Sequence, residues 1–120
     1  FADWEYYGKE GDKTKYSDFK SMIYDKERDV WKLWFLLDFS KVESVTDKIK
    51  YQSMVMQREI SCVKGSQRQV YAALMSEKMG KGEIVYSIDT PKEWETIIPN
   101  RLNDIYSHSF SVLCIDIKKN

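Results

Sequence analysis

The strongest hydrophobic stretch of the chain lies at 30–39 and reads Val-Trp-Lys-Leu-Trp-Phe-Leu-Leu-Asp-Phe. Nearly continuous apolar character is typical of a strand that is covered on both faces or lies under a helix, so this segment predicts a central strand. Two shorter strands are predicted upstream, at 3–7 and 16–23. The polar segments 8–15, with two glycines, and 25–29, in which every residue is charged, predict the turns between these strands.

The strand pattern continues through the second half of the chain. A polar loop at 40–48 leads into a long strand at 50–63, on which successive side chains point to opposite faces. Its two methionines share one face with Ile60 and Cys62, and only Arg58 interrupts this face, so Cys62 is expected to face the core. The remaining signals are a turn at 64–66, a strand at 69–75, a hairpin at 80–82 and a strand at 83–89.

The hydrophobic period then changes from that of a strand to that of a helix. The connector 91–99 is expected to hold one helical turn around Trp94, and Asn100 is the expected N-cap of an amphipathic helix. Asp104 would lie in the first turn, where a carboxylate favours the helix dipole, and Cys114 near the buried edge. The apolar positions are Leu102, Ile105, Tyr106, Ser109, Phe110, Leu113 and Ile117, and Lys118 and Lys119 would end the helix.

Hairpin-linked strands followed by one helix predict the α+β class, with a single antiparallel sheet of about six strands and the C-terminal helix packed on it. The length of 120 residues fits one domain, spanning 3–120. Cys62 on the core face of a strand and Cys114 on the sheet-facing stripe of the helix could meet. The residues alone leave two alternatives open, one disulfide or two buried thiols. A disulfide closing roughly 50 residues would stabilise the fold by about 4 kcal/mol in the chain-entropy model.

Composition narrows the classes of function. Lys and Arg number 19 and Asp and Glu number 19, so the net charge is zero, whereas a nucleic-acid binder usually carries a basic excess. No nucleic-acid partner is therefore expected. No segment approaches the ~20 apolar residues that span a bilayer, so no transmembrane segment is expected in the chain either. Aromatic residues make up 14% and either fill a small β core or provide a binding surface.

The first residues hint at export. Ala2 suits the last residue of a signal peptide, with a mature chain starting at Asp3. The alternative explanation is that the sequence as given simply begins there.

No constellation of catalytic or cofactor-binding residues is found. His108 is the single histidine and is expected on the helix surface, without a nucleophile and an acid to complete a triad. Asp18 and Asp38 lie among apolar neighbours, and Asp38, at the expected strand end, suits turn capping rather than acid–base work. Gly80-Lys81-Gly82 lacks the length of a phosphate loop, and no zinc or calcium motif occurs. We therefore expect no enzyme, no metal and no cofactor.

One charge feature stands out between positions 47 and 68. A basic stretch with aromatic residues suits binding of an acidic protein segment, a sulfated glycan or a phosphate backbone. The alternative is a solvated strand face whose charges protect a sheet edge from pairing. The basic residues are Lys48, Lys50, Arg58, Lys64 and Arg68, against Asp47 and Glu59.

The chain also resembles a known family. The resemblance covers nearly the whole chain and rests on spaced single residues rather than on a dense motif. These are an early Trp, Tyr16-Ser17-Asp18 with Ser21 and Ile23, Trp31 to Asp38, Tyr51-Gln52-Ser53, Cys62, Gly80-Lys81-Gly82, Trp94 with Ile97, Ile98 and Pro99, and Cys114. In this pattern the chain is similar to the surface-adhesin family typified by Haemophilus protein E.

The resemblance implies a six-stranded antiparallel sheet, a C-terminal helix and a disulfide that joins them, here Cys62–Cys114. It also implies an outer-membrane protein that forms dimers and binds host vitronectin and laminin. The family's vitronectin-binding stretch has a basic pair just before a strand-opening Tyr, and Lys48, Lys50 and Tyr51 stand in that place. The chain departs from the pattern in two respects: Ile49 separates the basic residues, and no lipid-bearing Cys is visible at the N-terminus.

Together these observations predict an exported binding protein of the Gram-negative envelope, in the periplasm or at the outer-membrane surface. Its expected partner is a protein, with host matrix proteins as the ligands that the resemblance implies. The alternative is a periplasmic structural or assembly protein that acts through a homodimer, using a strand edge or an aromatic face with Tyr6, Tyr7 or Trp31.

Overall fold

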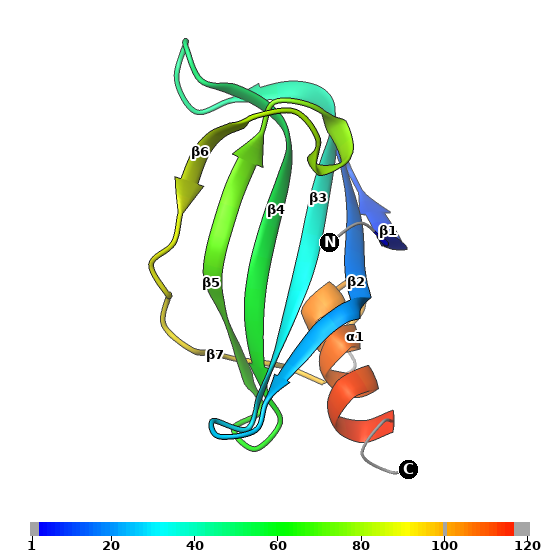
Figure 1. Ribbon diagram of the computed structural model, residues 1–120. Coiled ribbons are helices and arrows are strands. Elements are labelled where there is room, and N and C mark those ends of the chain that lie inside the picture. Colours follow the sequence, from blue (N-terminus) through cyan, green and yellow to red (C-terminus); the bar gives the residue numbers. More distant parts are fainter. Residues whose placement is uncertain (1–2, 100, 117–120) are drawn as a thin grey trace.

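The computed structural model describes residues 3–99 and 101–116. Within them one antiparallel sheet contains β1 to β6 in chain order, and a short β7 pairs with the first residues of β5 (Figure 1). The strands are β1 (Glu5–Glu10), β2 (Lys13–Asp25), β3 (Val30–Ser44), β4 (Lys50–Ser61), β5 (Ser66–Met75), β6 (Ile84–Ile88) and β7 (Glu95–Thr96). This arrangement, with one C-terminal helix behind the sheet, confirms the predicted α+β fold.

The alternation of side chains along β3 divides the core into two. Leu33 and Phe35 are buried on the face covered by the helix, which we call the helix face. Trp34 and Leu36 belong to a second cluster on the opposite face, which we call the open face. The nearly continuous apolar character of this strand is thus explained, because its side chains join a buried cluster on each face of the sheet. The open-face cluster comprises Leu36, Val55, Ala73 and Met75, with Trp4, Tyr16, Trp34, Tyr71 and Met79 packed against it.

The helix begins later than the pattern predicted. Helix α1 (Ile105–Phe110) continues into a π-helical segment, η2 (Ser111–Asp116). The Asp104 carboxylate caps it by accepting hydrogen bonds from the backbone N–H groups of Tyr106 and Ser107, at 3.0 and 3.2 Å. Including Leu102 in the buried stripe was wrong, since it is 90% exposed in the turn before the cap. Asn100 and residues 117–119, to which the prediction gave the N-cap and the helix end, lie outside the described residues, as does Ala2.

The disulfide joins the end of β4 to this helical segment. Cys62 and Cys114 are bonded, with their Cα atoms 5.3 Å apart and a separation of 52 positions in sequence. The pairing confirms the prediction, and it excludes the alternative of two buried thiols. Residue parity on β4 placed Cys62 correctly, because Met56 and Ile60 of the same parity are buried on the helix face.

Several predicted loops are shorter than expected because polar strands pair where solvent can reach one side of an antiparallel sheet. The turn predicted at 8–15 shrinks to Gly11–Asp12, and β3 runs on to Ser44 through most of the predicted loop at 40–48.

Two connections differ from the prediction in kind. The segment around Trp94 does not form a helical turn, because the two residues that follow Trp94 form strand β7. The hairpin at 80–82 is part of a longer β5–β6 connection that contains a 3-10 turn, η1 (Lys78–Gly80).

Candidate functional site

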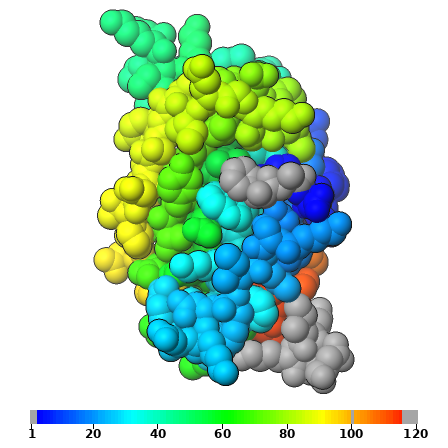
Figure 2. Space-filling model, viewed as in Figure 1, coloured from blue at the N-terminus to red at the C-terminus, as the bar shows by residue number. Residues whose placement is uncertain are grey.

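Two of the three predicted ligand-binding residues, Lys48 and Lys50, lie at the end of the β3–β4 hairpin, residues 44–50, which we call the tip; Tyr51 directly follows it. The tip stands clear of the body of the molecule at the top of Figures 1 and 2. Its backbone is ordered by hydrogen bonds: the N–H of Val45 donates to the Ile49 carbonyl at 2.9 Å, and the Thr46 hydroxyl accepts from the N–H groups of Lys48 and Ile49. The tip is therefore a defined, projecting surface.

Lys48, Lys50 and Tyr51 do not converge on one face of the hairpin. Lys48 and Lys50 are exposed. Tyr51 follows Lys50 on β4 and points to the opposite face, where its ring contacts that of buried Phe39 edge-on, with ring centroids 5.6 Å apart. Tyr51 thus fixes the base of the tip, while the lysines face solvent.

The basic stretch of the sequence is divided among separate surfaces. Arg58 lies on the helix face, with its guanidinium carbon 4.0 Å from the centre of the Tyr106 ring. Lys64 and Arg68 lie over Trp94, at 5.3 and 4.7 Å from its ring centre. Of the basic residues singled out by sequence, only Lys48 and Lys50 remain together at the tip.

Sequence reasoning missed the most heavily charged site of the sheet. Glu59 is only 2% exposed, yet its carboxylate accepts hydrogen bonds from Arg28 and Arg68, and Lys32 lies 4.0 Å away. Burial raises the pKa of Glu59, but the arginine hydrogen bonds outweigh it and hold the pKa below its ordinary value. Arg28 also lies 3.5 Å from the Asp25 carboxylate, so the charges of this cluster are paired within the protein, which indicates a structural role.

Asp38 binds the β5–β6 connection to the open face of the sheet through a hydrogen bond and an ion pair. Its carboxylate accepts a 2.7 Å hydrogen bond from the Met79 N–H and lies 3.2 Å from the ammonium group of Lys78. Ser53, its neighbour on β4, accepts from the Gly80 N–H at 2.9 Å. The prediction that Asp38 ends a strand was wrong, because β3 continues past it, but its bonding to a turn agrees with the predicted role.

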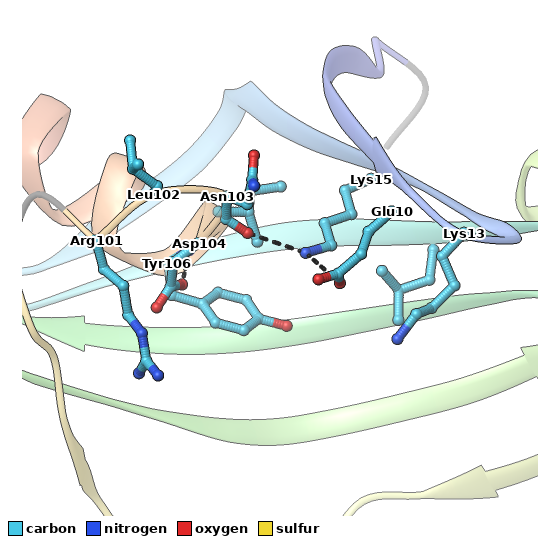
Figure 3. Close-up of a pocket in the computed structure, with 10 residues that line it drawn as sticks. Glu10, Lys13, Lys15, Arg101, Leu102, Asn103, Asp104 and Tyr106 are labelled. Atoms are coloured by element: carbon cyan, nitrogen blue, oxygen red, sulfur yellow. Dashed lines mark hydrogen bonds and ion pairs between the residues drawn. The ribbon is translucent and has the colours of Figure 1, made fainter.

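A depression of about 500 Å³ lies between the β1–β2 turn and the start of the helix (Figure 3). Within it the Lys15 ammonium donates to the Asn103 carbonyl at 3.1 Å and lies 3.2 Å from the Glu10 carboxylate. Arg101 points away from this pair in the close-up. Lys15 is therefore already paired within the depression.

The residues considered for catalysis each have contacts of their own in the structure. His108 is exposed on α1, as predicted, and its ring lies 5.2 Å from that of Tyr7. Asp18 is buried and accepts hydrogen bonds from the hydroxyl and N–H groups of Ser21. No cluster of three metal-ligating side chains occurs in the described part of the chain.

The aromatic residues considered for a dimer interface are dispersed. Tyr6 is 65% exposed on β1 and lies edge-on to Tyr16. Trp31 packs on the helix face, with its ring 4.9 Å from that of Tyr24. Across residues 3–99 and 101–116, no helix has the length and apolar character needed to cross a membrane.

Comparisons with known proteins point to one family. The family model described as surface-adhesin protein E matches residues 4–114. A structure of Haemophilus influenzae protein E has 17% sequence identity and a TM-score of 0.68, and the match covers 88% of this chain and 80% of the protein E chain. The selenomethionine form of protein E has 15% identity and a TM-score of 0.68, and the match covers 94% of this chain and 89% of that one. At such identities the likeness shows the fold. A search among curated proteins found no match.

Proposed function

The chain belongs to the surface-adhesin protein E family, whose model covers residues 4–114, and from this premise we propose that it is an exported adhesin of the bacterial envelope that works by binding a protein. The family is described by adhesion and not by a reaction. An adhesin must meet its ligand outside the cell, so we assign the protein to the outer-membrane surface of a Gram-negative bacterium, with the periplasm as the alternative.

For the ligand we propose a host extracellular-matrix protein, with vitronectin and laminin as the first candidates. The proposed contact surface is the tip, where Lys48 and Lys50 would meet an acidic segment of the ligand while Tyr51 holds the hairpin base. The observation that carries this proposal is the projection of an ordered hairpin with two exposed lysines beyond the body of the protein (Figure 2). Val45, 51% exposed, adds apolar area to the tip.

The test is surface plasmon resonance with immobilised vitronectin and laminin. The double variant Lys48→Ala/Lys50→Ala should bind about tenfold more weakly, since each exposed ion pair contributes up to about 1 kcal/mol and 1.4 kcal/mol corresponds to a factor of ten. The difference between wild type and variant should shrink as salt is raised, because exposed charges are screened.

The matched control is Lys26→Ala/Lys81→Ala, which removes two lysines exposed in other turns. It changes the net charge equally and should leave binding unaltered. If the wild-type protein binds neither matrix protein, the proposed ligands are wrong. Equal weakening by both double variants would instead show that only the overall charge matters and would refute the tip as the site.

A further inference from the structure

The two edges of the sheet differ in their protection against pairing with another strand. β1 carries three charged residues among six: Glu5, Lys9 and Glu10. β6 reads Ile-Val-Tyr-Ser-Ile, without a charge or a proline, and it pairs with β5 on one side only. Figure 1 shows no element of the described chain beyond it. Charges and prolines normally protect an exposed edge. Within the described residues β6 has no strand on its outer side, so it is an unprotected edge whose outward backbone groups can pair with another strand.

An apolar groove of about 390 Å³ on the open face lies next to this edge. Trp34 and Tyr71 meet edge-on at one side, with ring centroids 5.8 Å apart. Ile84 of β6 contributes to the lining at the sheet edge. Gln57 is the single polar residue among those that line it; the others are Trp34, Val55, Tyr71, Ala73, Met75 and Ile84. This composition suits a large apolar side chain.

The groove is open towards the outer side of β6 because the residues between the groove and this edge are small. Ser87 of β6 pairs with Ala73 of β5, and Ala73 pairs with Val55 of β4, so the three form a row across the open face. A strand added beyond β6 would lie about 4.8 Å from it. A tryptophan or phenylalanine opposite Ser87 could pass over Ser87 and reach the groove at Ala73, which lines it.

We propose that β6 and this groove form a second binding site, which takes an extended, uncharged peptide segment of a partner protein by strand addition. Backbone hydrogen bonds to β6 would supply affinity, and one large apolar side chain in the groove would supply specificity. The site is separate from the tip and does not depend on the function proposed for it.

A second copy of this chain fits the site less well. If β6 paired with another β6, the side chain entering the groove would be one of that strand's own open-face residues, Ser87 or Ile84. Neither side chain is long enough to reach past β6 to Ala73, so the groove would stay unfilled. A partner segment with an aromatic residue satisfies both the edge and the groove.

The probe is the peptide acetyl-Thr-Val-Trp-Val-Thr-amide, titrated into the isotope-labelled protein and followed by amide chemical shifts. The largest shifts are expected along Ile84–Ile88 and around Tyr71. Replacing the Trp of the peptide by Ala should weaken binding by at least about tenfold, which corresponds to 1.4 kcal/mol. N-methylation of the peptide backbone should abolish binding, since it removes the peptide N–H groups that would donate hydrogen bonds to β6.

The protein variant is Ser87→Lys, which places a charge in the path to the groove at an exposed position and should weaken binding by about tenfold or more. Thr90→Lys, with the same charge just beyond β6, is the matched control and should bind normally. Unchanged binding of the N-methylated peptide would overturn strand addition, and unchanged binding by Ser87→Lys would overturn the site. If sedimentation shows a dimer of the unliganded protein that Ser87→Lys dissociates, the edge belongs to a second copy and the proposal fails.

Discussion

The Arg28 guanidinium meets the Glu59 carboxylate at two points, with Nη1 2.7 Å from Oε2 and Nη2 2.8 Å from Oε1. This pair joins the β2–β3 turn to the middle of the sheet, 31 positions along the chain. The Arg68 Nε donates to the same carboxylate at 2.8 Å. The hydrogen bond to Glu59 raises the pKa of Arg28, and the arginines together lower that of Glu59, so each charge stabilises the other.

Replacing Glu59 by Gln should lower the free energy of unfolding by about 2 kcal/mol at pH 7, because two arginines lose a charged acceptor in a buried setting. Urea denaturation followed by circular dichroism measures this change. Lys20→Gln, at an exposed position on β2, is the control and should leave the urea midpoint nearly unchanged. A Glu59→Gln protein as stable as wild type would show that the cluster contributes no net stability.

The same pair predicts a dependence on pH. The pKa of Glu59 is lower in the folded than in the unfolded chain, so its stabilising contribution is fully present above the unfolded value of about 4.3. The contribution is lost as the pH falls through the folded value. The difference in unfolding free energy between wild type and Glu59→Gln should therefore be constant from pH 7 to about pH 5 and shrink below about pH 4. A difference that stays constant down to pH 3 would contradict the assignment.

The fold was predictable because periodicity reports which side chains face the core. The run 30–39 indicated a strand covered on both faces, and the parity of Cys62 indicated its side of the sheet. Strand ends were predicted poorly where polar residues pair at an accessible edge, as at 8–15. The connection around Trp94 was misjudged because its two-residue strand is held by β5, a long-range contact with no local signal.

The charged residues show why sites are harder to predict than folds. Sequence spacing grouped Arg58 and Arg68 with the tip lysines, although β4 and β5 carry them to opposite faces of the sheet. The sequence analysis counted Glu59 only as one of two acidic residues among the basic ones, because nothing near it in sequence indicates its pairing with Arg28. The β6 edge could have been noticed from its uncharged sequence, but its groove depends on Trp34, which lies 50 positions earlier.

Removing the disulfide should lower stability without abolishing the sheet. The double variant Cys62→Ser/Cys114→Ser frees a loop of about 50 residues, which corresponds to a loss of about 4 kcal/mol in the chain-entropy model. Denaturation in urea measures the loss. Wild type denatured in the presence of a reductant is the companion measurement, and it should match the double variant. Close agreement between oxidised wild type and the double variant would show that the bond adds no stability.

Replacing Gly80 by Ala should lower the free energy of unfolding more than replacing Gly11 by Ala. Both glycines have a left-handed backbone, with φ of 71° and 60°. A Cβ at Gly80 would lie 3.0 Å from the Val55 Cγ1, whereas a Cβ at Gly11 would have no neighbour within 4 Å. We expect Gly11→Ala to cost about 1 kcal/mol from backbone strain alone and Gly80→Ala about 2 kcal/mol or more. Thermal unfolding of the two variants compares them. Equal costs would show that the β5–β6 connection shifts freely over the open face.

The cap of the helix offers the last test, because Asp104 accepts hydrogen bonds from two backbone N–H groups and lies beside Asn103, whose φ is 59°. Asp104→Ala removes the acceptor and should lower the unfolding free energy by about 1 kcal/mol, whereas Asp104→Asn keeps an acceptor oxygen and should retain most of the stability. Chemical denaturation of both variants provides the comparison. If Ala and Asn are equally destabilising, the negative charge of Asp104 near the helix dipole matters more than its hydrogen bonds, and raising the salt concentration should then weaken the wild type towards the variants.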